Sequence, residues 1–394
     1  MNNLFKAFLI MLGLTACEKS EQVPVSYLTP HLLTETPAVS APVCKEVDSF
    51  AIRLFSVLAS NQQENFVFSP ASLEGVLHLL QQGARGASAT ELRALPMGKR
   101  GVATAMAPVE ANALFIAETL KLNKGIRQAQ IISVPFERDR DESARIINSW
   151  VIKHTQGLIK GIVSAGDITP VLRIVAANSI YLKEKWLHPF KPTYTREDTD
   201  FTLSDGSTTK VAMMHNSDDY RYAEDDDWQA VALPYSPAKA KGEPGYFIGI
   251  LPRGNVNDFI RTLTPEKYHS IRTALASAEP ENTSVRLPRF TLNPGTFSLK
   301  APLQCCGVNN IFSQEADFSG FVQEPLYVSD IIQRCYVEVE EEGTKAAAVT
   351  AAFIQYKCIS KKPNYITFNR PFIWIITDLH TSAAPYFMGV TQNP

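Results

Sequence analysis

The segment from Glu341 to Cys358, EEGTKAAAVTAAFIQYKC, constrains the fold of this chain more than any other stretch. It lies near the C-terminal end, between two segments with the composition of strands. A core strand is rich in Val, Ile and Phe, and a surface loop is rich in Gly, Pro, Asn and Asp. This segment is rich in alanine, the strongest helix former, so a helix capped by Thr344 is one open interpretation.

The composition is that of an ordinary globular protein and excludes several classes. Of the 394 residues, 45% are hydrophobic and 20% are charged, with a formal net charge of −2. This balance provides no basic surface for nucleic acid. The seven histidines are scattered without the spacing of a metal site, so we expect neither a metal nor a cofactor.

The N-terminus has the pattern of an export signal. Lys6 precedes an apolar run from Ala7 to Leu14, which is too short to span a bilayer as a helix. The ending LTAC resembles the lipoprotein box, which predicts a signal peptide over residues 1–16 and lipidation of Cys17; cleavage of a plain signal peptide near Ala16 is the alternative. Glu18 follows the cysteine and favours the bacterial outer membrane, and a secreted protein is the other possibility.

Residues 17–43 are expected to form the lipidated cysteine and a tether. The segment contains four prolines, and proline-rich segments are stiff and extended. A disordered pro-segment without a spacing role is the alternative. The chain has six cysteines, and their spacing predicts neither a zinc site nor a disulfide framework.

From Cys44 onward, helical and strand patterns alternate, which predicts one mixed α+β domain over residues 44–394. Helical patterns occupy residues 45–60, 141–159 and the part of 65–84 that follows a short strand and a turn at Pro70. Strand patterns occupy residues 173–186, 244–253, 285–292, 336–340 and 372–379.

Several motifs carry a resemblance to a known family. FVFSPASL, AANSIYLKEKW, VRLPRFTL, ADFSG, EPLYVSD, VEVEEEGTKAAAVTAAF and FNRPF occur in the order seen in serpins, the serine-protease-inhibitor family. The resemblance covers Cys44 to Pro394. It implies a monomer with three β-sheets, about eight or nine helices and an exposed reactive-centre loop at about residues 341–362.

The resemblance also implies a suicide-substrate mechanism. A target protease cleaves the exposed loop, the loop inserts into the main sheet as a new strand, and the attached protease is inactivated. Alternation along a strand would bury the face of Thr344 and leave Lys345 toward solvent. The hinge of this movement would comprise Glu341, Glu342, Gly343, Thr344, Ala346, Ala347, Ala348, Val349 and Thr350.

The family's spacing from the hinge places the reactive bond between Lys357 and Cys358. A lysine before this bond suits a trypsin-like protease, or a lysine-specific cysteine protease. A shift of one residue would present Tyr356 and favour a chymotrypsin-like target. The Cys358 thiol is either a redox-sensitive element or an incidental small residue.

Five further positions match residues that control sheet opening in the family. Trp186 matches the tryptophan at which the loop enters the sheet. Ser69, Ser72 and Asn178 match polar residues below the point where the sheet parts. Gln333 stands where many members carry a histidine, so the hydrogen bonding at this point is expected to differ.

Two other function classes remain as alternatives. A serpin fold that binds a ligand without inhibiting a protease is one, although the small residues of the hinge favour inhibition. A serine enzyme is the other, because Ser207–Lys210 and Ser236–Lys239 fit the S-x-x-K pattern. Neither is followed by the partner motifs of that enzyme class, so this interpretation is weak.

Overall fold

A computed structural model of the chain describes residues 47–60, 63–97, 106, 109–123, 131–237, 244–344, 362–381 and 383–394. The helices within these residues are α1 (Val47–Ala59), α2 (Pro70–Gly83), α3 (Gly86–Ala94), α4 (Arg140–His154), α5 (Val256–Arg261), α6 (Pro265–Ser277) and α7 (Lys300–Cys305). In the described part of the chain, no helix has both the length and the apolar character of a membrane span.

The strands divide between two hydrogen-bonded sheets. They are β1 (Phe66–Phe68), β2 (Val109–Ala117), β3 (Ile131–Val134), β4 (Ile174–Tyr181), β5 (Glu184–Lys185), β6 (Arg196–Thr202), β7 (Thr208–Glu224), β8 (Trp228–Pro234), β9 (Tyr246–Pro252), β10 (Glu281–Pro288), β11 (Phe290–Leu292), β12 (Phe297–Ser298), β13 (Asp330–Glu340), β14 (Gly343–Thr344), β15 (Asn364–Thr367), β16 (Phe372–Thr377) and β17 (Phe387–Thr391).

Local capping explains where the main helices begin. The Ser69 side chain accepts the backbone N–H of Ser72 at 3.2 Å, and Pro70 is the first residue of α2. The turn predicted at Pro70 is therefore the first turn of a helix. The Asp139 carboxylate caps α4 by accepting the N–H of Glu142 at 2.9 Å.

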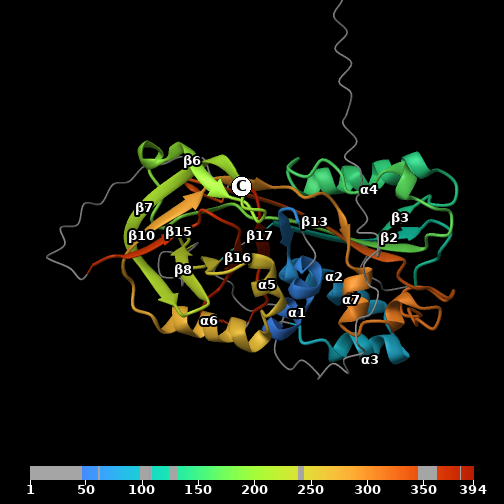
Figure 1. The fold of residues 1–394 in the computed structure, drawn as a ribbon. Coiled ribbons are helices and arrows are strands. Elements are labelled where there is room, and N and C mark those ends of the chain that lie inside the picture. Colours follow the sequence, from blue (N-terminus) through green and yellow to red (C-terminus); the bar gives the residue numbers. More distant parts are fainter. Residues whose placement is uncertain are drawn as a thin grey trace, which may run out of the picture.

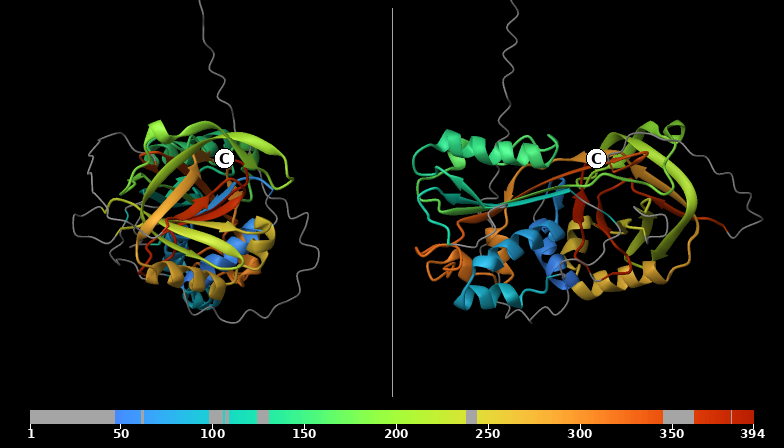
Figure 2. Two further views of the ribbon diagram at one scale, coloured as in Figure 1. Left: turned by 60° about the vertical axis from the view of Figure 1, so that its left-hand side comes forward. Right: turned by 180° about the vertical axis from the view of Figure 1, so that it is seen from behind.

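The nine-stranded sheet consists of two parts joined by the long strand β7. Residues 208–220 of this strand pair with β6 and β10, whereas residues 221–224 pair with β8. Figures 1 and 2 show β7 curving from one group of strands to the other. Together with the eight-stranded sheet, this gives the three-sheet α+β architecture that the sequence predicts.

The predicted strand over residues 285–292 is divided at Arg289. Its first part, β10, pairs with β7, and its second part, β11, pairs with β13. The chain therefore passes from one sheet to the other at this residue, a change of partner that the alternation of side chains does not reveal.

The eight-stranded sheet has the order β3-β2-β4-β13-β14-β5, and its two central strands β4 and β13 run parallel. Figure 1 shows α4 lying across one face of this sheet, with α1, α2, α3 and α7 on the opposite side. Ile147 and Val151 of α4 pack with Phe115 and Ala177 of the sheet in one buried cluster.

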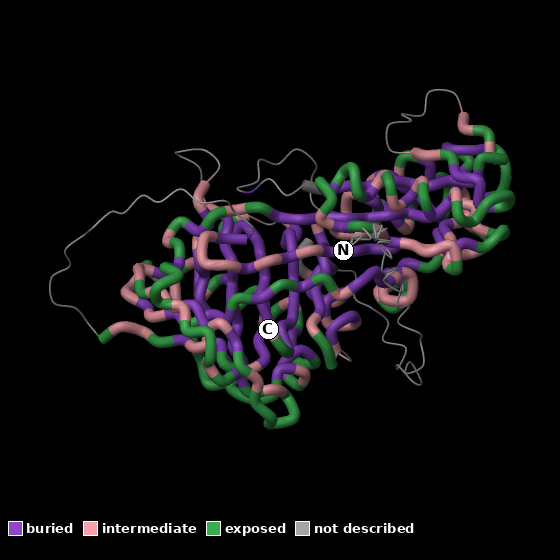
Figure 3. Tube along the Cα trace, turned by 90° about the horizontal axis from the view of Figure 1, so that it is seen from above, coloured by how far each residue is buried: buried purple, intermediate pink, exposed green. Residues whose placement is uncertain are grey.

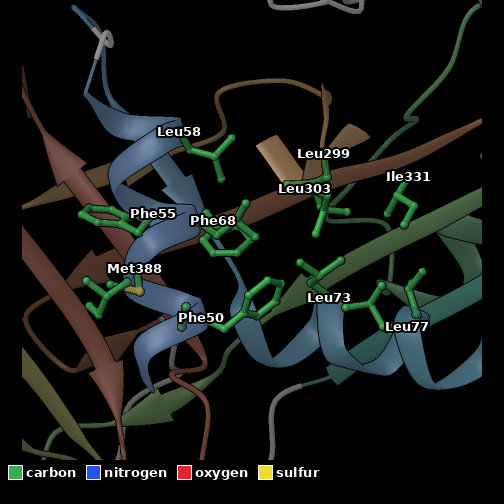
Figure 4. Packing of buried hydrophobic residues seen from close by; sticks show 14 of the residues in the cluster. Phe50, Phe55, Leu58, Phe68, Leu73, Leu77, Leu299, Leu303, Ile331 and Met388 are labelled. Atoms are coloured by element: carbon green, nitrogen blue, oxygen red, sulfur yellow. The ribbon is translucent and has the colours of Figure 1, made fainter. Parts of the chain in front are cut away.

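The largest core cluster lies between α1, α2 and the strands behind them. Figure 4 shows Phe55 of α1 beside Met388, and Leu73 of α2 near Phe68 and Ile331. The central strands are buried along their length, while exposed residues gather at turns and outer helices (Figure 3). This packing fixes β13 at the centre of the molecule.

Candidate functional site

The eight-stranded sheet is closed along most of its centre and open at one end. Residues Asp330–Tyr336 pair directly with Val175–Tyr181 of β4. Beyond Tyr336, β13 no longer pairs with β4. The short strand β14 lies here between β13 and β5. Gly343 and Thr344 pair with β13 on one side and with β5 on the other. The first two strand residues of the predicted loop segment therefore already lie inside the sheet.

Gly343 occupies a position that admits no side chain. A Cβ atom at this residue would lie 2.1 Å from the carbonyl oxygen of Glu184 and 2.7 Å from the Cα of Lys185, and its φ is +155°. The glycine of the EEGT motif is thus required by the close approach of β5. This explains why the segment can enter the sheet at this point.

Thr344 is completely buried and is hydrogen-bonded through its side chain. Its Oγ1 lies 2.8 Å from the hydroxyl of Tyr235, and either group can be the donor. Burial raises the pKa of the Tyr235 phenol well above its ordinary value, so the hydroxyl stays protonated. The burial of Thr344 agrees with the face assignment made from the alternation of the segment.

Trp186 holds the chain at the entrance to the sheet. Its indole Nε1 donates to the carbonyl of Glu340 at 2.8 Å, and its backbone N–H donates to the carbonyl of Glu342 at 3.0 Å. The indole stacks on Tyr235, with 4.6 Å between ring centroids. Trp186 therefore contacts the hinge directly, as the sequence predicts. Tyr235, which stacks on Trp186 and bonds Thr344, was not identified from the sequence.

Glu341 anchors the start of the hinge by an ion pair. Its carboxylate accepts from Thr195 Oγ1 at 2.8 Å and from Arg289 Nη2 at 3.1 Å. Arg289 also pairs with Glu197 at 2.9 Å. Thr195 and Arg289 are remote in sequence from the hinge, so no local pattern identifies them.

Two neighbouring carboxylates lie on the outward face of β13 beside the hinge. The hydrogen bond with Glu338 and partial burial raise the pKa of Glu340 to about 7. Tyr336, on the same face, donates its hydroxyl to Glu338 at 2.9 Å. The end of β13 therefore carries a concentration of negative charge that grows as the pH rises through neutrality.

The polar residues predicted below the opening form one buried network. Gln333 accepts the N–H of Ser69 at 2.8 Å and donates to its carbonyl at 3.0 Å and to the side chain of Asn178. Asn178 donates to Ser72 and to Asn112, which lies directly opposite it on β2. Asn112 was missed, although an asparagine in the apolar segment ANALFIA is a visible signal. The amide of Gln333 is not titratable, unlike the histidine that many family members carry at this position.

The remaining predicted site residues lie outside the described residues. They are Cys17, Ala346, Ala347, Ala348, Val349, Thr350, Tyr356, Lys357 and Cys358.

The structure gives no support to a serine enzyme at Ser207. The Ser207 hydroxyl donates to Asp205 at 2.6 Å, and Lys210 forms an ion pair with Asp200 at 2.8 Å. The hydroxyl of Ser236 donates to the carbonyl of Trp186 at 3.1 Å. Across the described ranges, no group of His, Cys, Asp and Glu side chains could hold a metal ion.

Comparison with known proteins agrees with this architecture over the whole domain. The model of the family described as "Serpin (serine protease inhibitor)" matches residues 45–394. An uncharacterised serpin-like protein from Thermococcus kodakarensis is 32% identical over 381 residues, which is 90% of this chain and 86% of that protein.

Solved structures show the same fold. Serpin48 from the insect Tenebrio molitor, described as a highly specific serpin, superposes with a TM-score of 0.73 at 26% identity, covering 88% of this chain and 97% of its own. Human thyroxine-binding globulin, solved in complex with thyroxine, has a TM-score of 0.75 at 22% identity, covering 89% of this chain and 98% of its own. From its sequence, its sheets and these relatives, the chain belongs to the serpin family, whose members are generally protease inhibitors rather than enzymes.

Proposed function

We propose that this serpin traps a serine endopeptidase by cleavage of its reactive-centre loop and insertion of that loop into the eight-stranded sheet. The observation that carries the proposal is the position of Gly343 and Thr344 between β13 and β5. The sheet below them is closed, with seven residue pairs joining β4 to β13. This arrangement suits an inserting strand, because its first residues are in place and β4 and β13, between which the rest must insert, are still paired with each other.

The free energy available for insertion is large enough to drive the reaction. About fifteen inserted residues would gain ladder hydrogen bonds to both neighbours, each worth roughly 0.5–1.5 kcal/mol net. The sum is of order 10 kcal/mol, comparable with the stability of a whole domain. At about 3.3 Å per residue the inserted strand would span roughly 50 Å, which is enough to carry an attached protease across the molecule.

The proposed chemistry begins as ordinary peptide-bond cleavage. The serine hydroxyl of the protease attacks the carbonyl of Lys357, and the amine of Cys358 leaves with the proton, so that an ester joins the two proteins. Insertion of the loop then pulls this ester away and distorts the protease before water can hydrolyse it. A trypsin-like target follows from the Lys357 side chain, with a lysine-specific cysteine protease or, through Tyr356, a chymotrypsin-like protease as alternatives.

The first experiment is to mix the purified protein with trypsin or with chymotrypsin and to separate the products on a denaturing gel. We expect trypsin to give a complex that survives denaturation, together with a C-terminal peptide that begins at Cys358. The variant Lys357→Ala is the control and should form far less of this complex. Cleavage in the loop without any complex would support the non-inhibitory alternative, a binding protein with the serpin fold.

We further propose that Cys17 carries a lipid anchor in the bacterial envelope. The support is the LTAC sequence, and the family match that begins only at residue 45, beyond the proline-rich segment. Incorporation of radiolabelled palmitate in a bacterial host should be lost in Cys17→Ala. Equal labelling of both proteins would contradict the anchor.

A further inference from the structure

A group of basic side chains surrounds His215 on the sheet formed by β6, β7, β10 and β15, which lie side by side in Figure 1. From Thr283 to Leu287 of β10, buried residues alternate with Ser284 and Arg286, so these two lie on the outer face. Arg286 is directly opposite His215 of β7, and the Ser284 hydroxyl lies 3.0 Å from His215 Nε2. The imidazole therefore belongs to the same face.

The chain ahead of β7 brings two more cations to this histidine. Arg196, the first residue of β6, pairs with Met213, which precedes His215 by two positions on β7. The Tyr194 ring lies 6.4 Å from the His215 ring, and Lys191 Nζ lies 5.6 Å from the centre of the Tyr194 ring. We call this group the His215 cluster; it consists of Lys191, Tyr194, Arg196, His215, Ser284 and Arg286.

The His215 cluster carries positive charge without a counter-charge in the part of the chain that the structure describes. None of its lysine and arginine side chains forms an ion pair with a described residue. Two carboxylates close to it in sequence have other partners, since Glu197 pairs with Arg289 at 2.9 Å and Asp218 with His188 at 3.1 Å. The described residues therefore leave the mutual repulsion of these cations without an opposing charge.

The same charges keep the imidazole neutral. Burial lowers the pKa of His215 below its ordinary value, and the positive charges of Arg286 on β10 and Arg196 on β6 lower it further. A proton on His215 would add one more positive charge to a group that already repels itself. An anion between the guanidiniums would remove that penalty and would favour the protonated imidazole.

We propose that the His215 cluster is a binding site for a phosphate dianion, held by the guanidiniums of Arg196 and Arg286. The Ser284 hydroxyl and the protonated imidazole would be further donors. A guanidinium presents a planar fork of N–H groups that matches two phosphate oxygens, and such charge-assisted hydrogen bonds are stronger than neutral ones. Inorganic phosphate and a phosphate monoester, such as a lipid headgroup carries, present the same oxygens. The site shares no residue with the hinge, so it does not depend on the proposed inhibition.

The test follows the His215 ring by NMR of the purified protein labelled with carbon-13 in its histidine rings. The protein is titrated between about pH 5 and 8, where histidine changes charge, in sodium phosphate and in sodium chloride of equal ionic strength. The signal that is lost in His215→Gln identifies the residue. We expect phosphate to raise the pKa of His215 relative to chloride, because a dianion beside the imidazole favours its charged form. The change of the signal with phosphate concentration at neutral pH gives the affinity.

Two variants each remove one guanidinium of the site. Arg286→Gln and Arg196→Gln should each weaken phosphate binding about tenfold, the effect of losing a hydrogen bond from a charged donor. Each should also raise the pKa of His215 in chloride, because a positive charge that lowers it is gone. Arg261→Gln is the matched control, because Arg261 is also exposed but pairs with Asp258 at 2.7 Å on α5. The control should change neither quantity.

Glycerol 3-phosphate, a soluble monoester, is the second probe. Tighter binding than that of inorganic phosphate would favour an ester such as a lipid headgroup as the ligand, and equal or weaker binding would favour free phosphate; either result supports the site. The proposal is overturned if neither probe raises the pKa of His215 above its value in chloride. It is also overturned if Arg261→Gln weakens binding as much as Arg286→Gln does, since phosphate would then respond only to the net charge of the protein.

Discussion

Replacing Thr344 with arginine is expected to convert the protein from an inhibitor into a substrate of the same protease. The wild-type side chain is fully buried between β13 and β5, where its hydroxyl meets that of Tyr235 at 2.8 Å. A guanidinium at this position would lose its hydration without gaining an ionic partner from the phenol. The hinge of the variant should therefore leave the sheet, and its re-entry after cleavage should be slow.

The magnitude follows from the cost of burying a charge. The effective penalty for an ion inside a protein is several kcal/mol even after relaxation. A penalty of only about 3 kcal/mol in the transition state for insertion slows that step about a hundredfold, because each 1.4 kcal/mol is a factor of ten. Hydrolysis of the protease ester would then win, and the number of inhibitor molecules consumed per trapped protease should rise more than about tenfold.

The assay titrates a fixed amount of trypsin with increasing inhibitor and measures residual activity, while a denaturing gel separates complex from cleaved protein. Thr344→Ser is the control, because it keeps the hydroxyl that bonds Tyr235 and removes only a methyl group. This variant should titrate trypsin as the wild type does. If Thr344→Arg also titrates as the wild type does, entry of Thr344 into the sheet is not part of the mechanism.

Three further changes test neighbouring parts of the site. Gly343→Ala should lower the free energy of unfolding by about 2 kcal/mol or more, because the added Cβ would lie 2.1 Å from a carbonyl oxygen. Gly254→Ala is the control, because its added Cβ meets nothing within 4 Å. Equal midpoints of urea unfolding for the two variants would contradict this prediction. Glu340 binds its proton more tightly in the folded protein, since the hydrogen bond with Glu338 raises its pKa to about 7 from 4.5. Its contribution to the free energy of unfolding is therefore present at pH 4.5 and is lost as the pH rises through 7, and it amounts to less than about 1 kcal/mol because the carboxyl is only partly buried. Glu340→Gln should weaken the dependence of the free energy of unfolding on pH between pH 4.5 and 8, measured by urea unfolding. An unchanged dependence would contradict the role of the hydrogen bond between Glu338 and Glu340. Lys357→Phe should shift complex formation on denaturing gels from trypsin to chymotrypsin, and continued trapping of trypsin would show that another bond is cleaved.

Elements with strong local patterns could be predicted from the sequence. The helices α1 and α4 follow from apolar spacing, and β4, β9, β16 and the second part of β13, residues 336–340, follow from their strand composition. The order of these helices and strands along the chain indicates the fold, and the EEGT motif indicates the hinge. These features depend on residues that are close in sequence, which is why a single chain reveals them.

Contacts between remote segments could not be predicted in this way. Thr344 and Tyr235 are separated by 109 positions, and Glu341 and Thr195 by 146. Nothing in the segment around Tyr235 marks it as the partner of a hinge residue.

The register at the hinge has a consequence for the charges that surround it. Thr344 lies opposite Val339, so a ladder that continues unbroken would bring Lys345 opposite Glu338 on the outward face. Before insertion, the carboxylates of Glu338 and Glu340 repel one another, and this repulsion contributes to the raised pKa of Glu340. An ammonium group opposite Glu338 would relieve that repulsion, so the charge pattern favours a strand that continues past Thr344. Because salt screens such an attraction at a partly exposed site, added salt should weaken this contribution while leaving the buried contacts of Thr344 unchanged.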